Sequence, residues 1–366
     1  MIPPPIQPQH ETPADEYLVT KELEAAVHIA KTLGRPLLLT GEPGVGKSSL
    51  APYLAAKYQW PYKKFVVKSD TKASDFFYYY DSIGRFSNAQ DPNSALEAAS
   101  FLRFNALGWA LLCTYRQQEL NPLSDLVDQP LGHDPSSEQV PNCVVLIDEI
   151  DKAPRDVPND LLDEFDHFAF SVNELRASRY GDGNKFEFQA QYQQQVKGGN
   201  AGQIKPLLII TSNDERGLPD AFLRRCIFHH IPVPPLAQGN ADDPQVTLDD
   251  ILILQAGQQW CQSNGQLYKP FSKFFQNLKQ LPLKKPPSVS EMIWFLQAFG
   301  DIKFDGLKLV KTDFYNPQSA ESLNPRQLSI QLRQGALYTL FKSAQDQVTA
   351  AKCVDDFVKD AVNSHG

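Results

Sequence analysis

The chain has 366 residues, 42% of them hydrophobic, which is enough for about two domains with buried cores. Its 35 Lys and Arg residues are outnumbered by 43 Asp and Glu residues, and the net charge of -8 disfavours nucleic acid as a partner unless a local basic patch reverses it. The five cysteines show no C-x-x-C spacing, which fits a reducing compartment, and no run approaches the roughly 18 apolar residues of a membrane helix. We therefore expect a cytoplasmic protein with no membrane contact.

The N-terminal residues predict a short lead-in and then a helix. Residues 1–15 carry five prolines and few apolar side chains, so we expect them to be disordered. Thr20 is a suitable N-cap, and apolar residues follow at helical spacing until Gly34 ends the pattern. This helix leads into residues 37–39, an apolar run that predicts a buried strand.

The strongest motif is Gly41-Glu42-Pro43-Gly44-Val45-Gly46-Lys47-Ser48, which matches G-x-x-x-x-G-K-[ST] directly after that strand. Its glycines let the backbone bend around a triphosphate and direct N–H groups at the phosphate oxygens. Lys47 is expected over the β- and γ-phosphates, while Ser48 and Ser49 begin a helix whose N-terminus favours anions. With the Ser48 hydroxyl on Mg²⁺, the motif predicts a site for ATP and Mg²⁺. Pro52 predicts a kink one turn into the helix.

Three residues ahead of the first helix, Tyr17, Leu18 and Val19, are further candidates for nucleotide contact. In phosphate-loop ATPases of this layout, residues at such positions often flank the adenine. Simple packing under the helix is an equally good interpretation.

The region from about residue 75 to residue 142 is predicted to be an insertion. It opens with the aromatic cluster at residues 76–80, for which core packing and a contact surface both stay open. Apolar spacing over residues 94–116 predicts one long helix, and the Pro- and Ser-rich residues 121–141 predict a surface loop.

A second motif combines two acids with a strand. The apolar run 143–147 ends in Asp148 and Glu149, the pattern of a buried parallel strand with carboxylates at its C-terminal end. Ligands of open α/β sheets bind at that end, so Asp148 can reach the Mg²⁺ shell and Glu149 can deprotonate the attacking water. Another apolar run, 206–210, is followed by Asn213, whose amide can hold that water or the γ-phosphate. A turn-forming Asn is the alternative.

The remaining residues predict a hairpin, a pair of arginines and a helical region. Residues 185–200 are rich in Gln with flanking glycines and predict the hairpin. Arg224 and Arg225 follow a short predicted helix, and the planar charged fork of arginine suits a transferring phosphate. A Pro-rich segment near residue 235 indicates a linker. Beyond it, residues 248–260, 291–299 and 328–363 carry helical periodicity, which predicts a smaller helical domain at 236–366.

In this order, the loop, the two acids, Asn213 and Arg225 resemble the AAA+ ATPases, as Walker A, Walker B, sensor 1 and arginine finger, with Arg224 as the fallback finger. The resemblance implies an α/β fold: a P-loop domain at residues 16–235, built on a parallel five-stranded sheet flanked by helices, and a smaller α-helical lid domain at 236–366. Within AAA+ the chain is most similar to the MoxR group, on residues 35–47 and on Asp148-Glu149-Ile150-Asp151-Lys152-Ala153.

That group implies an ATPase that forms a ring with copies of itself, usually a hexamer, and remodels a partner protein, often one with a von Willebrand factor A domain. An insertion in the second helix and a hairpin before sensor 1 would correspond to residues 75–86 and 185–196. The sensor 2 arginine is the main departure, because Ser290 best matches its position.

Two other functions use the same ATP site. A nucleic-acid-directed motor or loader is disfavoured by the acidic balance, and an ATP-gated scaffold, as in bacterial conflict and defence systems, is disfavoured by the intact Glu149.

Overall fold

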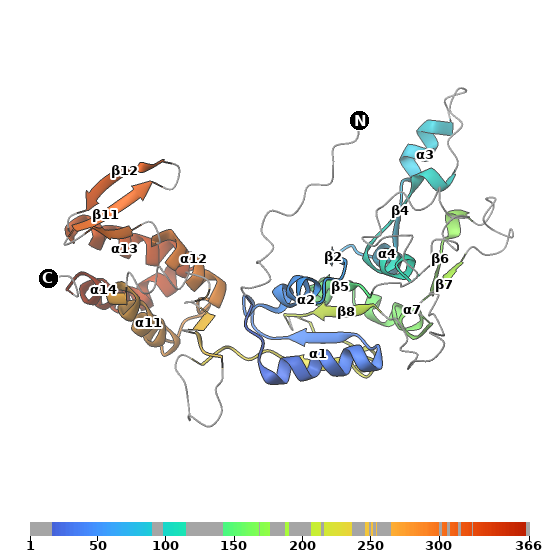
Figure 1. Ribbon diagram of the computed structural model, residues 1–366, viewed down its shortest axis with the longest axis horizontal. Helices are drawn as coiled ribbons and strands as arrows, with labels where there is room; N and C mark the ends of the chain where they lie inside the picture. Colours follow the sequence, from blue (N-terminus) through green and yellow to red (C-terminus); the bar gives the residue numbers. More distant parts are fainter. Residues whose placement is uncertain are drawn as a thin grey trace. The chain divides into compact units, whose positions relative to one another are not determined.

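The structure is a computed structural model (Figure 1). It describes residues 17–89, 98–114, 142–175 except 168, 187–189, 206–235 except 214–215, part of 246–254, and 265–363 except 300–301, 306–307, 314–315 and 324. The chain folds into two compact units. The first contains Tyr17, Lys21–Gly41 and Gly46–Ile231, and the second contains Leu18–Thr20, Glu42–Val45 and the residues from Pro232 onward.

A parallel five-stranded sheet forms the centre of the first unit, in the order β2-β5-β8-β1-β9. Its strands are β1 (Leu37–Thr40), β2 (Tyr62–Val66), β5 (Val144–Asp148), β8 (Leu207–Thr211) and β9 (Ile227–His230). Every residue of the three inner strands, β5, β8 and β1, is buried, which explains why they read as continuous apolar runs. The predicted α/β fold class is confirmed.

Helices and short turns surround this sheet. They are α1 (Lys21–Leu33), η2 (Lys47–Ser49), α2 (Leu50–Tyr58), η3 (Ala73–Phe76), α3 (Ser82–Ala89), η4 (Ala98–Phe101), α4 (Ala106–Leu112), η6 (Ile150–Lys152), α6 (Val157–Asp160), α7 (Leu162–His167), η7 (Asn173–Leu175) and α8 (Asp220–Leu223). Helix α1 buries its apolar face as predicted and is followed by Gly34, which has a positive φ of 59°. The helix after the phosphate loop begins as a 3₁₀ turn, so Pro52 lies in the first turn of α2, where a missing N–H costs little.

The single helix predicted over residues 94–116 is wrong. Its described residues form η4, the strand β4 (Leu102–Phe104) and α4, and β4 pairs antiparallel with β3 (Tyr78–Tyr80). Leu102 and Phe104 are buried while Arg103 is exposed, so this stretch follows the two-residue period of a strand. Pairing with the aromatic cluster overrides the local helical spacing. Most of that cluster is core, since Phe76, Phe77 and Tyr78 are buried.

Several predictions fall partly or wholly on residues outside the described part. The lead-in 1–15, the loop 121–141 and most of the hairpin 185–200 are among them. Within the described residues, β7 (Glu187–Gln189) pairs antiparallel with β6 (Ala169–Ser171).

The second unit is built mainly on helices, as predicted, but it also contains an unpredicted sheet. Its elements are α11 (Gly265–Lys279), α12 (Val289–Phe299), β10 (Ile302–Asp305), β11 (Lys308–Asp313), β12 (Asn316–Leu323), α13 (Pro325–Leu340) and α14 (Ala344–Asn363). The three strands form an antiparallel sheet in chain order. The alternation of Ile302 and Phe304 with polar residues, followed by Asp305-Gly306, is a hairpin signal that helical periodicity alone does not detect.

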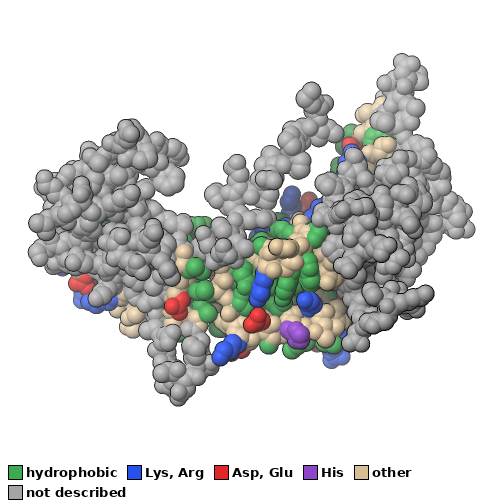
Figure 2. Space-filling view, viewed as in Figure 1, with side chains coloured by type: hydrophobic (Ala, Val, Ile, Leu, Met, Phe, Trp, Pro, Cys, Tyr) green, Lys and Arg blue, Asp and Glu red, His purple; other side chains and the backbone are tan. Residues whose placement is uncertain are grey.

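The described surface carries charges of both signs. Figure 2 shows acidic and basic side chains interspersed with apolar ones on one face of the described residues. None of the described helices combines the length and apolar character that crossing a membrane requires.

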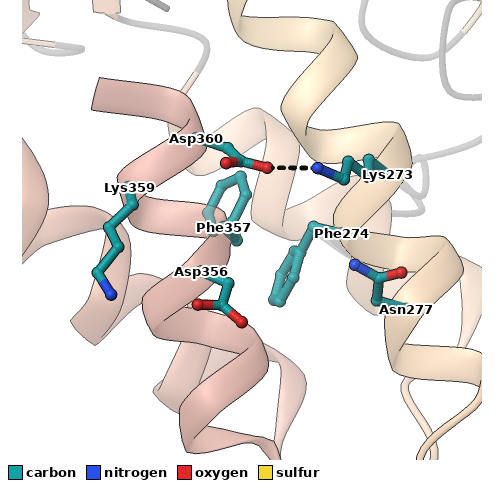
Figure 3. Close-up of a pocket in the computed structure, with 7 residues that line it drawn as sticks. All are labelled: Lys273, Phe274, Asn277, Asp356, Phe357, Lys359 and Asp360. Carbon is teal, nitrogen blue, oxygen red and sulfur yellow. Dashed lines mark hydrogen bonds and ion pairs between the residues drawn. The ribbon is translucent and has the colours of Figure 1, made fainter. Parts of the chain in front are cut away.

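Phenylalanines dominate the core of the second unit. Phe274 on α11 and Phe357 on α14 stack with ring centroids 4.4 Å apart, below a small groove between the two helices (Figure 3). Lys273 and Asp360 form an ion pair of 2.7 Å across this groove. Because these two charges neutralise one another in solvent, the groove offers no strong charge to a ligand.

Candidate nucleotide-binding site

The phosphate loop connects the carboxyl end of β1 to the turn η2. Gly41, Gly44 and Gly46 all have positive φ, at 146°, 82° and 91°, a conformation that side chains with a Cβ rarely adopt. Lys47 is only 6% exposed, and its ammonium donates to the carbonyl of Gly41 at 2.7 Å. The loop thus curls around a buried cation, the arrangement that a triphosphate site requires.

Tyr17 packs directly against the last glycine of the loop. A Cβ on Gly46 would lie 3.2 Å from Cε2 of Tyr17, closer than ordinary van der Waals contact, so a side chain there would press against the ring. The Tyr17 ring also lies 5.4 Å from the ring of Tyr53 on α2. The sequence predicted that Tyr17 flanks the nucleotide or packs under the helix, but its contact with Gly46 could not be predicted from the local pattern. Of its predicted neighbours, Leu18 is exposed and Val19 half-buried, and neither has a described contact that assigns it to a nucleotide.

Asp148 lies at the carboxyl end of β5 and receives three hydrogen bonds. The Ser48 hydroxyl donates to its Oδ1 at 2.6 Å, the Thr211 hydroxyl donates to the same oxygen at 2.7 Å, and the Lys64 ammonium lies 2.6 Å from Oδ2. Burial by itself would raise the pKa of Asp148, but the hydrogen bonds from Lys64, Ser48 and Thr211 outweigh it and lower that pKa below its ordinary value. The carboxylate is therefore held ionised.

Lys64 is a contact that sequence analysis missed. It lies on β2, the strand next to β5, and its pairing with Asp148 depends on the strand order of the sheet. A lysine in an exposed edge strand has no local feature that would single it out.

Glu149 follows Asp148 and has a positive φ of 64°, unusual for a residue with a side chain. Its Oε2 accepts a bond from Lys152 at 2.6 Å, and its Oε1 lies 3.4 Å from the amide nitrogen of Asn213. The backbone N–H of Asn213 donates to Asp151 at 3.2 Å. The structure therefore brings together the predicted acid and the predicted amide at the carboxyl edge of the sheet.

The residues present fit a magnesium ion held together with a phosphate. The Ser48 hydroxyl uses its proton toward Asp148, so its lone pairs are available to a cation. Among the described residues, no cluster of three His, Cys, Asp or Glu side chains could hold a metal alone. Magnesium commonly binds through few protein ligands plus substrate phosphates and water, so Ser48 and Asp148 suffice as the protein's share.

The two arginines lie near the amino-terminal ends of the parallel strands, opposite the carboxyl-terminal ends where the phosphate loop begins. They come between α8 and β9, and β9 pairs with β1 from Ile227 opposite Leu37 to His230 opposite Thr40. The arginines therefore precede the amino end of β9, whereas the phosphate loop follows the carboxyl end of β1. At about 3.3 Å per residue, the strands separate them by about 13 Å. The Arg225 guanidinium donates to the carbonyl of Ala221 at 3.2 Å.

Comparisons with known proteins agree with this architecture. A family model described as AAA domain (dynein-related subfamily) matches residues 36–226, more than half of the chain. The matched range contains the phosphate loop, Asp148, Glu149, Asn213 and both arginines. A search of curated proteins found no match.

Proposed function

The chain belongs to the AAA family, in its dynein-related subfamily, and from this premise we propose that it is a MoxR-like ring ATPase that uses ATP hydrolysis to remodel a partner protein. One observation carries the proposal. The glycine loop, its buried Lys47, the Ser48–Asp148 pair and Glu149 all converge on one edge of the parallel sheet. That edge is where open α/β sheets bind their ligands.

Each side chain has a defined part in the hydrolysis. The loop N–H groups and Lys47 bind the phosphates, and Ser48 with Asp148 would hold Mg²⁺, which neutralises charge on the phosphate oxygens. Glu149 accepts a proton from water as the water oxygen bonds to the γ-phosphorus and the bond from that phosphorus to the bridging oxygen breaks. Asn213, next to Glu149, can orient the same water through its amide.

We further propose that Arg225, or Arg224 if the register is one residue off, acts on the nucleotide of a neighbouring copy. The strand register supports this, because about 13 Å of strand lies between the arginines and the phosphate loop of their own chain. An arginine at the amino-terminal ends of the strands would act on a nucleotide bound at a boundary between subunits. The ring, which we expect to be a hexamer, follows from this arrangement.

The partner is proposed to be a protein, with a von Willebrand factor A domain protein as the first choice. A nucleic-acid motor is the second candidate because it shares the ATP site. The interspersed charges on the face shown in Figure 2 and the net charge of -8 support the protein partner.

Glu149→Gln tests the hydrolysis. The amide cannot accept the proton, so turnover should fall by about 10² to 10⁴ while ATP binding is retained. Steady-state phosphate release measures turnover, and a nucleotide titration measures ATP binding. Glu24→Gln, which changes an exposed glutamate paired with Lys57, is the matched control and should leave both unchanged. Wild-type turnover in Glu149→Gln would mean that another group is the base.

Mixing two inactive variants tests the ring. Arg225→Ala should bind ATP and fold but lose turnover by about 10³ or more, as expected for an arginine acting in trans. Adding Lys47→Ala subunits should restore part of the activity, because some boundaries then join an intact Lys47 to an intact Arg225. Arg85→Ala, an exposed arginine on α3, serves as control. Background activity at every mixing ratio, with mixed rings confirmed by native mass measurement, would contradict an arginine acting in trans.

A further inference from the structure

Thr211, the last residue of β8, lies between the two acids of the site. It is 1% exposed, and its neighbours in the sheet are β5, which carries Asp148, and β1, which leads into the phosphate loop. Its hydroxyl donates to Oδ1 of Asp148 at 2.7 Å and accepts the backbone N–H of Glu149 at 2.9 Å. A single hydroxyl can do both, because it has one proton to donate and lone pairs to accept.

The hydrogen bond to the backbone of Glu149 matters because of the conformation there. With a φ of 64°, Glu149 occupies a region that persists in non-glycine residues only when the surroundings enforce it. The backbone conformation sets the direction in which the Glu149 side chain leaves the main chain. Lys152 and Asn213 then bind the oxygens of its carboxylate. A lost N–H partner would therefore displace the carboxylate as well as the backbone.

The hydrogen bond to Asp148 acts on the metal side of the site. Oδ1 of Asp148 accepts protons from both Thr211 and Ser48, so the Thr211 hydroxyl helps to set the angle at which the carboxylate meets Ser48. One buried hydroxyl is thus linked to both the magnesium-side acid and the proposed base.

We propose that Thr211 is a positioning residue that aligns Asp148 for Mg²⁺ and Glu149 for proton transfer through its one hydroxyl. This inference rests on the proposed ATPase function and deepens it. In this proposal Thr211 acts through the two acids that its hydroxyl contacts.

Thr211→Val tests the proposal, because valine keeps the shape and removes the hydroxyl. We expect the variant to bind a non-hydrolysable ATP analogue in EDTA as tightly as the wild type, since the phosphate loop is intact. With the analogue present, Mn²⁺ affinity measured by electron paramagnetic resonance should fall about tenfold. Turnover should fall about 10- to 100-fold in kcat with little change in KM.

Two further variants separate positioning from a purely structural role. Thr211→Ser retains the hydroxyl and should stay within about threefold of the wild type in Mn²⁺ affinity and kcat. Thr114→Val removes another buried hydroxyl of the first unit, one that donates to the carbonyl of Leu111 at 2.6 Å, and should lower stability alone. If Thr211→Val does not fold, Thr211→Ala takes its place, because it also removes the hydroxyl.

The outcomes distinguish this inference from the function on which it rests. Unchanged Mn²⁺ affinity and kcat in Thr211→Val, or an equal loss in Thr211→Ser, would overturn the role of the hydroxyl while leaving the ATPase intact. A wild-type protein that binds neither the analogue nor Mn²⁺ with it would overturn both.

Discussion

The buried polar side chains at the site of the first unit and a buried acid of the second unit have different roles. In the first unit, Thr40, Lys47, Asp148 and Thr211 are all buried, and all lie at the carboxyl edge of the parallel sheet or directly after it. In the second unit, the buried acid Asp346 lies in the first turn of α14. The first arrangement concentrates polar groups where a ligand can use them, whereas the second uses them to complete the fold.

The hydrogen bonds of Asp346 show what completing the fold means. Its Oδ1 accepts the backbone N–H of Lys284 at 2.8 Å, and its Oδ2 accepts that of Lys285 at 3.2 Å and the Ser343 hydroxyl at 2.8 Å. The backbone N–H of Asp346 donates to the Ser343 hydroxyl at 3.1 Å, so Ser343 caps the start of α14. Its partners are backbone groups and a cap that the chain supplies, so nothing in this arrangement calls for a ligand.

Among the variants in this comparison, Lys47→Ala should have the largest effect, and the effect should fall on ATP binding rather than on stability. The lysine lies in the loop where the β- and γ-phosphates are expected, so its loss should weaken ATP binding by at least about 100-fold. The thermal unfolding temperature should stay close to that of the wild type. Isothermal titration and a melting curve measure the two, with Lys57→Ala on the exposed face of α2 as control. Unchanged ATP affinity would refute the phosphate-loop assignment.

The sequence predicts those parts of the site that are local. The loop and the acids after β5 are contiguous motifs, so their residue types and spacing suffice to identify them. Lys64 and Thr211 are not predictable in the same way, because each reaches the site through the order of the strands in the sheet. Their contacts come from the tertiary structure.

The fold shows the same limit. The three inner strands, β1, β5 and β8, follow from buried apolar runs that end in polar residues. Residues 102–104 do not follow from their own pattern, because β4 owes its strand conformation to pairing with β3, more than 20 residues earlier. The sheet of β10, β11 and β12 was not predicted, because it lies between residues 291–299 and 328–363, whose helical periodicity predicted a helical domain.

Asp346→Asn tests the second unit. It should lower stability and leave ATP binding unchanged, the opposite of what is expected for Lys47→Ala. The backbone N–H of Lys284, together with Ser343 and Lys285, lowers the pKa of Asp346 below its ordinary value despite the opposing effect of burial. Its folded-state pKa is lower than its unfolded one, so its contribution to stability is present above about pH 4 and is lost as pH falls through the folded value.

At pH 7 the Asp346→Asn variant should therefore unfold a few degrees lower than the wild type and bind ATP with the same affinity. The gap in unfolding temperature should close in acid. Asp355→Asn, an exposed carboxylate paired with Arg333, is the control and should change neither. An unfolding temperature equal to that of the wild type at pH 7 would show that the cap is not needed for the fold.

Ser290→Ala has the smallest expected effect and tests a residue of the second unit whose hydroxyl contacts the phosphate loop. Ser290 lies between Ser288 and Glu291, which form the capping box at the start of α12. Its hydroxyl donates to the carbonyl of Gly44, a loop residue that belongs to the same compact unit. At 3.4 Å this bond is long, so its loss should change ATP affinity and turnover by no more than about twofold.

Ser288→Ala is the matched control, because it removes the cap of the same helix and should lower stability by about 1 kcal/mol without affecting ATP binding. A fall in turnover for Ser290→Ala as large as that for Glu149→Gln would mean that α12 senses the nucleotide through this hydroxyl. In that case Ser290 would take over the part that a sensor 2 arginine plays in related ATPases.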